Sequence, residues 1–145
     1  MVIPEGEADI VSAIQIAGDE GIPILPRGAG TSQCGQTVGE ALVLDVSKKL
    51  SGMISLDKEN QRVTVQPGVV LDQLNAYLKP HGLCFPVDVS TSSRATIGGM
   101  TANNSCGARS IRYGNMVDNV HVIDAILADG SCLLYTSDAA DDTPC

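Results

Sequence analysis

The sequence predicts one domain of mixed helix and sheet, α/β or α+β, built around a single core. Its 145 residues favour one domain. Hydrophobic residues make up 43% of the chain and charged residues 18%, which is typical of a globular protein. Helical spacing of apolar residues alternates with short apolar runs, without an internal repeat or a low-complexity segment.

The first half of the chain predicts one helix and four short strands. Between Glu7 and Ala17, apolar residues recur at the spacing of one helical face. Gly18 or Gly21 is suited to end this helix, because glycine readily adopts the left-handed conformation found after helices. The apolar runs that follow predict strands at 22–25, 42–46, 53–56 and 62–65.

The second half predicts another helix, a long irregular stretch and a hairpin. Apolar residues at helical spacing predict a helix that begins at Leu71 and ends at Pro80–Gly82. Residues 87–107 show almost no periodicity. A strand is predicted at 120–127, and the pair Asp129-Gly130 after it is typical of a hairpin turn.

The charge and composition exclude several classes of function. The chain has 9 basic and 17 acidic residues, which gives a net charge of −8, so a basic surface for nucleic acid is absent. No apolar run approaches the ~20 residues that a membrane span needs. Acidic residues also interrupt the N-terminus where the apolar core of a signal peptide would begin. We therefore expect a cytoplasmic protein with no nucleic-acid partner and no membrane span.

The five cysteines and two histidines do not form a metal-binding pattern. The cysteines contain no CxxC pair, and His81 and His121 have no ligand spacing to them or to each other. We therefore expect no metal site and take the cysteines as reduced thiols. His81 falls in a helix-ending turn and His121 in a strand, so we expect both to be structural.

The last fourteen residues, 132–145, differ in character from the rest. Cys132 to Asp142 resembles the in-frame translation of a transposon-end sequencing adapter. We expect this tail not to be native and to pack poorly, apart from pairing of Leu133 and Leu134 with the strand at 120–127. The domain would then be 1–131. We expect both of its ends to be truncated, as in a piece of a longer gene product.

The first glycine cluster follows a predicted strand and invites comparison with phosphate-binding motifs. After Gly28 and Gly30, the third glycine of the dinucleotide fingerprint would fall at Gln33. The helix that should follow is interrupted by Gly35 and Gly39, and no Gly-Lys-Ser/Thr of a P-loop is present. The remaining possibilities are a turn whose N–H groups form an anion-binding nest, with Arg27 beside it, and an ordinary surface turn.

The second cluster, between Val87 and Gly107, consists almost wholly of small or polar side chains. Such a stretch buries too little apolar area to hold itself in place. We therefore expect it to be either a flexible loop or a segment ordered around a large ligand, whose backbone the small side chains let approach closely.

Together the two clusters resemble a known family. The patterns Pro26–Ser32, Ala95–Met100 and Asn104–Ser110 are similar to those of FAD-linked oxidases of the p-cresol methylhydroxylase/vanillyl-alcohol oxidase type. The resemblance covers about Pro4 to Gly130. The last pattern, with Tyr113-Gly114, is most similar to the D-lactate and D-2-hydroxyglutarate dehydrogenase branch.

The resemblance implies an α+β fold of two small α/β subdomains with FAD between them. The first loop would wrap the pyrophosphate, and the second would run beside the pyrophosphate and the isoalloxazine. Members with histidyl-linked flavin have His where this chain has Thr31, whose hydroxyl is a poor nucleophile, so we expect non-covalent FAD. The implied cofactor-binding residues are Pro26, Arg27, Gly28, Ala29, Gly30, Thr31, Ser32, Thr96, Ile97, Gly98, Gly99, Asn103, Asn104, Ser105, Gly107, Tyr113 and Gly114.

The resemblance also sets the expected function. It implies the FAD-binding part of an oxidoreductase that transfers a hydride from a small 2-hydroxy acid to flavin, with an electron acceptor that the sequence does not identify. In the family, the substrate-binding and catalytic groups lie in a C-terminal domain outside this sequence, as would the iron–sulfur cluster of large members. The full-length protein could still associate peripherally with a membrane. The alternatives are the same FAD domain in another oxidase or reductase chemistry, and a non-redox nucleotide-binding module.

Overall fold

A computed structural model of the chain describes residues 1–136 and 143–144. It is a mixed helical and sheet structure, as predicted. The elements are α1 (Glu7–Asp19), β1 (Ile24–Arg27), β2 (Leu42–Asp45), β3 (Met53–Asp57), β4 (Arg62–Val65), α2 (Leu71–Leu78), the 3₁₀ turn η1 (Lys79–His81), α3 (Ile97–Ala102), α4 (Ser110–Tyr113), α5 (Met116–Asn119), β5 (Val122–Ile126), β6 (Cys132–Thr136) and β7 (Thr143–Pro144).

Helix α1 lies where the apolar spacing predicts it. Its buried face contains Ala13 and Ile14, which pack with Leu44 of β2 in one of three core clusters. The helix ends at Asp19, and Gly21 follows with a positive φ of 65°. The left-handed turn at this glycine reverses the chain toward β1, which confirms the expected end of the helix.

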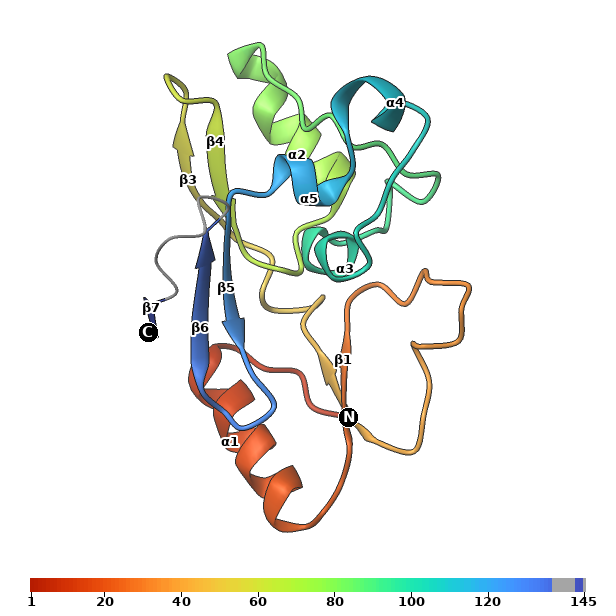
Figure 1. Ribbon diagram of the computed structural model, residues 1–145, viewed down its shortest axis with the longest axis vertical. Coiled ribbons are helices and arrows are strands. Elements are labelled where there is room, and N and C mark those ends of the chain that lie inside the picture. The colour runs from red at the N-terminus through yellow and green to blue at the C-terminus, as the bar shows by residue number, and fades with distance from the viewer. Residues whose placement is uncertain (137–142, 145) are drawn as a thin grey trace.

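Strands β1 and β2 pair in parallel and place the first glycine cluster. Ile24 of β1 pairs with Leu42 of β2, and the register continues to Arg27 opposite Asp45. The connection between the two strands, residues 28–41, therefore begins at the carboxyl end of β1 and returns to the amino end of β2. Figure 1 shows this long connection in orange, extending beside α3.

Strands β3 and β4 lie where the apolar runs predict strands; they pair in an antiparallel hairpin, and α2 packs against it. Leu74 and Leu78 of α2 are buried with Val69 in the second cluster. The helix passes into η1, and Gly82 ends it with a φ of 70°, as the sequence predicts.

The segment 87–107 differs from the sequence-based expectation of an irregular stretch with little packing of its own. Residues Val87, Ala95 and Met100 are buried in the third core cluster with Leu71 of α2 and Met116 of α5. These few apolar residues suffice because neighbouring elements complete the cluster around them.

The backbone of this segment is also bonded to the chain ahead of α2. Ile97 N–H donates to the Val69 carbonyl at 2.8 Å, and Gly98 N–H donates to the Pro67 carbonyl at 2.9 Å. Helix α3 has six residues, which is too short for its apolar period to stand out in the sequence. Packing across elements, and not local pattern, determines this part of the fold.

The last hairpin is formed by β5 and β6. The turn is the predicted one: Gly130 has a φ of 83°, and Leu127 N–H donates to the Ser131 carbonyl at 2.7 Å. The Asp129 carboxylate accepts hydrogen bonds from the side chain and backbone N–H of Ser131, which lowers the pKa of Asp129 below its usual value.

Strand β6 lies within the segment expected to be non-native. It pairs with β5 at five positions, from Cys132 opposite Ile126 to Thr136 opposite Val122, which is more regular than the expected pairing of Leu133 and Leu134 alone. The other tail residues, 137–142 and 145, lie outside the described residues. The domain boundary at 131 stays a prediction.

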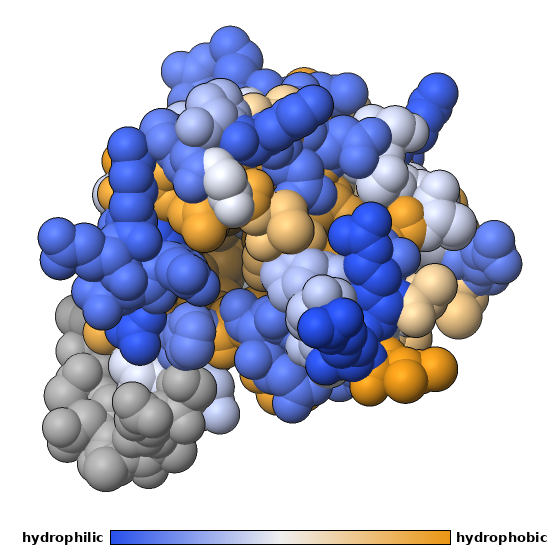
Figure 2. Space-filling view, turned by 90° about the horizontal axis from the view of Figure 1, so that it is seen from above, coloured by the Kyte–Doolittle hydropathy of each residue, from blue (hydrophilic) through white to orange (hydrophobic). Residues whose placement is uncertain are grey.

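The elements form two groups in Figure 1. One contains α1, β1, β2, β5 and β6, and the other contains β3, β4 and α2 to α5. Viewed from above, the surface is mostly hydrophilic, with apolar residues visible toward the middle and at one edge (Figure 2). Within residues 1–136 and 143–144, no helix combines the length and apolar character needed to cross a membrane.

Candidate functional site

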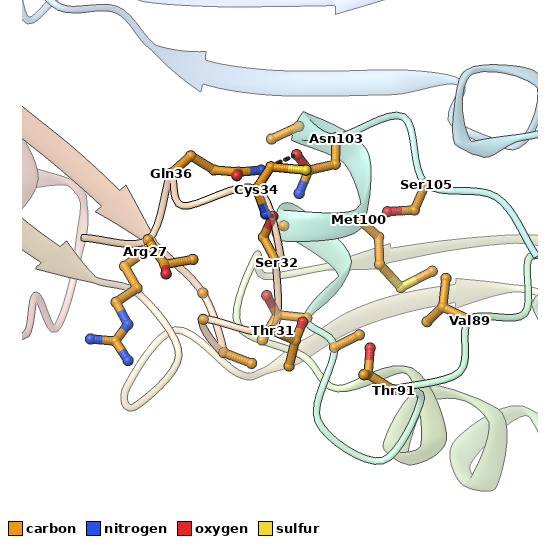
Figure 3. Close-up of a pocket in the computed structure, with 18 of the residues that line it drawn as sticks. Arg27, Thr31, Ser32, Cys34, Gln36, Val89, Thr91, Met100, Asn103 and Ser105 are labelled. Atoms are coloured by element: carbon orange, nitrogen blue, oxygen red, sulfur yellow. Dashed lines mark hydrogen bonds between the residues drawn. The ribbon is translucent and has the colours of Figure 1, made fainter. Parts of the chain in front are cut away.

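A pocket of about 460 Å³ lies between the connection after β1 and helix α3. The two glycine clusters, which are separated by more than fifty residues in sequence, form most of its lining (Figure 3). Its lining residues are Pro26, Arg27, Gly28, Ala29, Gly30, Thr31, Ser32, Cys34, Gln36, Thr37, Val89, Thr91, Ala95, Thr96, Gly99, Met100, Ala102, Asn103 and Ser105.

Eleven of the predicted cofactor-binding residues lie in this lining. They are the whole first cluster, Pro26 to Ser32, with Thr96, Gly99, Asn103 and Ser105 of the second. The structure therefore brings the two motifs together at one site. Six predicted residues lie outside the lining: Ile97, Gly98, Asn104, Gly107, Tyr113 and Gly114. Their assignment to the cofactor stays a prediction.

The glycines outside the lining are needed for packing of the chain on itself. A side chain at Gly98 would meet Pro67, and one at Gly107 would meet the backbone and carboxylate of Asp88. Gly114 has a φ of 78°, which only glycine adopts readily. These contacts explain why the motif contains glycine at positions that do not face the pocket.

Asn104 and Tyr113 also make contacts within the protein. The Asn104 side-chain oxygen accepts a hydrogen bond from Val117 N–H at 2.9 Å. The Tyr113 ring is partly exposed, and the Arg112 guanidinium lies over it at 5.3 Å from the ring centre. Asn104 therefore ties α3 to α5, a role that the sequence motif alone does not reveal.

Eight lining residues were not predicted: Cys34, Gln36, Thr37, Val89, Thr91, Ala95, Ala102 and Met100. Cys34, Gln36 and Thr37 follow the first motif within five residues, so their closeness to it in sequence is a signal by which they could have been assigned to the pocket. Val89 and Met100 are apolar residues in a stretch that was assigned to ligand binding on its small and polar side chains. Both pack in or against the core cluster that contains Met100, and this packing sets their positions.

Gly28 and Thr96 are where the two clusters meet. A Cβ at Gly28 would overlap the Thr96 hydroxyl, so the absence of a side chain at 28 lets the first loop approach the start of α3. Thr96 is only 3% exposed and is the residue that precedes α3. The geometry of the pocket therefore depends on glycine at position 28.

Two buried polar atoms in the lining have no hydrogen-bond partner within the described chain: Arg27 Nε and Thr96 Oγ1. A buried donor without a partner costs about 1–3 kcal/mol, so native proteins rarely leave one unsatisfied. One of these atoms belongs to each glycine cluster. Both are able to donate to an oxygen of a bound ligand.

The charge of the lining favours an anion. Arg27 is the only charged residue among the described residues that line the pocket. Its guanidinium lies next to Gly30, where a Cβ would come within 2.9 Å of Arg27 Nη2. Gly30 also has a positive φ of 69°. In Figure 3 the Arg27 guanidinium points away from the Thr31 and Ser32 side chains. Arg27 therefore packs close to Gly30 and supplies the positive charge of the lining.

The fold places a pocket between a glycine loop and a short helix, and its single charged side chain and two unpartnered donors suit an anionic ligand. Residues 1–134 match the family model described as FAD binding domain, and the chain belongs to this family. The family resemblance of the two motifs is thereby confirmed.

Two curated relatives indicate which members of the family this chain is similar to. D-2-hydroxyglutarate dehydrogenase of Haemophilus influenzae is 38% identical over 136 residues, which cover 92% of this chain and 13% of that protein. The mitochondrial D-lactate dehydrogenase (cytochrome) of Kluyveromyces lactis is 38% identical over 135 residues, covering 90% of this chain and 23% of that protein.

One solved structure supports the fold. The 6-hydroxy-D-nicotine oxidase from Arthrobacter nicotinovorans superposes with a TM-score of 0.83 at 20% identity, over 95% of this chain and 30% of that one. This chain thus spans less than a third of each of these three proteins.

The lining fits the diphosphate of FAD. Arg27 Nε and Thr96 Oγ1 are donors without partners, and phosphate oxygens accept such bonds. Gly30 and Gly99 also lie in the lining, and a side chain at either position would meet one of these two donor groups: the Arg27 guanidinium at Gly30 and the Thr96 hydroxyl at Gly99. Within the described ranges 1–136 and 143–144, no group of three or more His, Cys, Asp or Glu residues is placed to hold a metal ion.

Proposed function

We propose that this chain is the FAD-binding domain of a flavin-dependent oxidoreductase that oxidises a 2-hydroxy acid of the D-lactate, glycolate or D-2-hydroxyglutarate class. The observation that supports the cofactor site most strongly is the pair of unpartnered buried donors, Arg27 Nε and Thr96 Oγ1, in one glycine-lined pocket. The names of the relatives support the substrate class. When bound, the flavin supplies the hydride acceptor for this oxidation.

The residues of the pocket would have different roles in binding FAD. Arg27 supplies positive charge, and Thr96 donates a hydrogen bond to a phosphate oxygen. The backbone around Gly28 and Gly30 contributes N–H groups to the same anion. Met100 presents apolar surface to the pocket and excludes water there. These roles stay proposals for each residue.

The attachment of the flavin would be non-covalent. Thr31 lies in the lining at the position where histidyl-linked members of the resembling family have His. A threonine hydroxyl is weakly nucleophilic at neutral pH unless a base activates it. No His is among the described lining residues to act as such a base. When the flavin-loaded protein is unfolded and then filtered to retain the polypeptide, all of the flavin should therefore pass into the filtrate.

Two other functions stay open beside this one. The same domain could serve another oxidase or reductase, and that protein would also be yellow. A non-redox nucleotide-binding module would be colourless as purified. The chain spans 13% of its D-2-hydroxyglutarate dehydrogenase relative, and we expect it to be inactive without a substrate domain. The cytoplasmic location and the lack of a nucleic-acid partner also stay predictions.

Loss of flavin absorbance under anaerobic conditions tests the proposal in the complete gene product that contains this chain. D-lactate, glycolate and D-2-hydroxyglutarate are added separately, with L-lactate and L-2-hydroxyglutarate as controls. We expect one of the first three to bleach the flavin. A yellow protein that none of them bleaches would overturn the substrate class, and a colourless folded protein would overturn the cofactor.

A further inference from the structure

The segment 33–40 forms part of the pocket wall, yet it is weakly attached to the rest of the molecule. Cys34, Gln36 and Thr37 line the pocket. The backbone bonds of the segment are local: Cys34 N–H donates to Ser32 Oγ, and Val38 N–H donates to the Gly35 carbonyl. Such a segment can move without breaking a sheet or a helix.

One hydrogen bond joins this segment to the opposite wall. Gln36 Nε2 donates to Asn103 Oδ1 at 3.1 Å, across 67 residues of sequence. Figure 3 shows the two side chains pointing toward one another, with the bond drawn between them. Among the described residues, this is the only hydrogen bond from residues 33–40 to any residue outside the connection between β1 and β2.

The segment also has the freedom that movement requires. Gly35 has a φ of 82°, and neither it nor Gly39 has an atom within 4 Å of where a Cβ would stand. Val38, between them, is 74% exposed. Glycines in open space at both sides of the exposed tip let the backbone change direction at low steric cost.

We propose that residues 33–40 are a lid over the flavin pocket and that the Gln36–Asn103 hydrogen bond is its latch. This inference rests on the proposed function, because the ligand that the lid admits and retains is FAD. Gln36 is thus a positioning residue that acts through Asn103. Since the bond lies wholly within the protein, it slows the entry and the exit of the cofactor alike.

The rates of FAD association and dissociation, measured by stopped-flow flavin fluorescence on the full 145-residue chain, test the latch. In Gln36→Ala we expect both rates to rise by roughly two- to ten-fold, the range of one net hydrogen bond. The dissociation constant should then change less than about two-fold, because one bond restrains both steps. Gln33→Ala is the matched control, since Gln33 is an exposed amide of the same segment outside the lining.

Two further measurements keep the outcome clear. In an Asn103→Ala background, Gln36→Ala should have no additional effect on either rate, because the latch is already lost. Alkylation of Cys34, followed by peptide mass spectrometry with the exposed Cys84 as internal reference, should be faster in Gln36→Ala than in the wild type with FAD bound.

The outcomes separate the lid from the site beneath it. Unchanged rates in Gln36→Ala would overturn the latch. A rise in the dissociation rate alone would also overturn it, because Gln36 would then act as a direct contact to FAD. A folded wild-type chain that binds no FAD would instead overturn the proposed function.

Discussion

The buried hydroxyl of Thr96 is the residue on which the phosphate site can be tested most cleanly. Thr96→Val keeps the shape of the side chain and removes the unpartnered oxygen. Without FAD, we expect the free energy of unfolding to stay the same or to rise slightly, because a buried unsatisfied group is lost. The FAD dissociation constant should rise by about ten-fold, as expected for a hydrogen bond to a charged group.

Thr101→Val is the matched control for this variant. Thr101 lies on α3, the helix that Thr96 precedes, and is outside the lining; its hydroxyl donates to the Ile97 carbonyl at 2.8 Å. Denaturant unfolding and fluorescence titration with FAD measure both quantities in each variant. An equal loss of FAD affinity in Thr96→Val and Thr101→Val would show that the Thr96 hydroxyl makes no specific contact with FAD.

At the same scale, the whole first cluster lies in the pocket lining, whereas only part of the second does. Arg27, Gly28 and Gly30 are close in sequence and follow a strand, so local pattern is enough to group them. The motif alone assigns Asn104 and Gly107 to the cofactor, and in the structure both also bond or pack within the protein. A motif indicates which residues are required but not which surface each of them faces.

Among the elements, helix α3 bears on the expectation that the second cluster is either a flexible loop or ordered around a large ligand, because contacts within the protein already hold it. The N–H groups of Ile97, Gly98 and Met100 are all bonded to carbonyls of the chain. We therefore expect these amides to be protected from hydrogen exchange without FAD, while amides of 33–40 exchange fast and slow down when FAD binds. Exchange measured with and without FAD, by peptide mass spectrometry, tests this contrast. Fast exchange at 97–100 in the flavin-free protein would mean that FAD, and not packing within the protein, orders this segment.

Elements of at least eight residues, such as α1 and α2, were predicted because their apolar faces repeat over two or more turns. The short helices α3, α4 and α5 were not predicted, because four to six residues contain little periodic signal. The Gln36–Asn103 bond could not be predicted either. It depends on two segments brought together by the third core cluster and the β1–β2 pair.

For the whole molecule, the last hairpin decides where the domain ends. The adapter resemblance of residues 132–145 predicts that their deletion changes stability by no more than about 0.5 kcal/mol, as surface changes do. The structure argues for a larger loss, because deletion removes all five β5–β6 pairs. Denaturant unfolding of the 1–131 chain beside the full chain measures the difference. A change within about 0.5 kcal/mol would support the tail as foreign to the domain.

The central claim is that one pocket, formed by the two glycine clusters, binds the diphosphate of FAD. Competition at equilibrium tests it most directly: FAD bound to the full 145-residue chain is titrated with ADP and, separately, with riboflavin, which lacks phosphate. We predict that ADP displaces FAD and that riboflavin at the same concentration displaces much less, because in the proposed site Arg27 and the Thr96 hydroxyl would bind phosphate oxygens. Displacement by riboflavin as strong as that by ADP, or no displacement by ADP, would contradict the account.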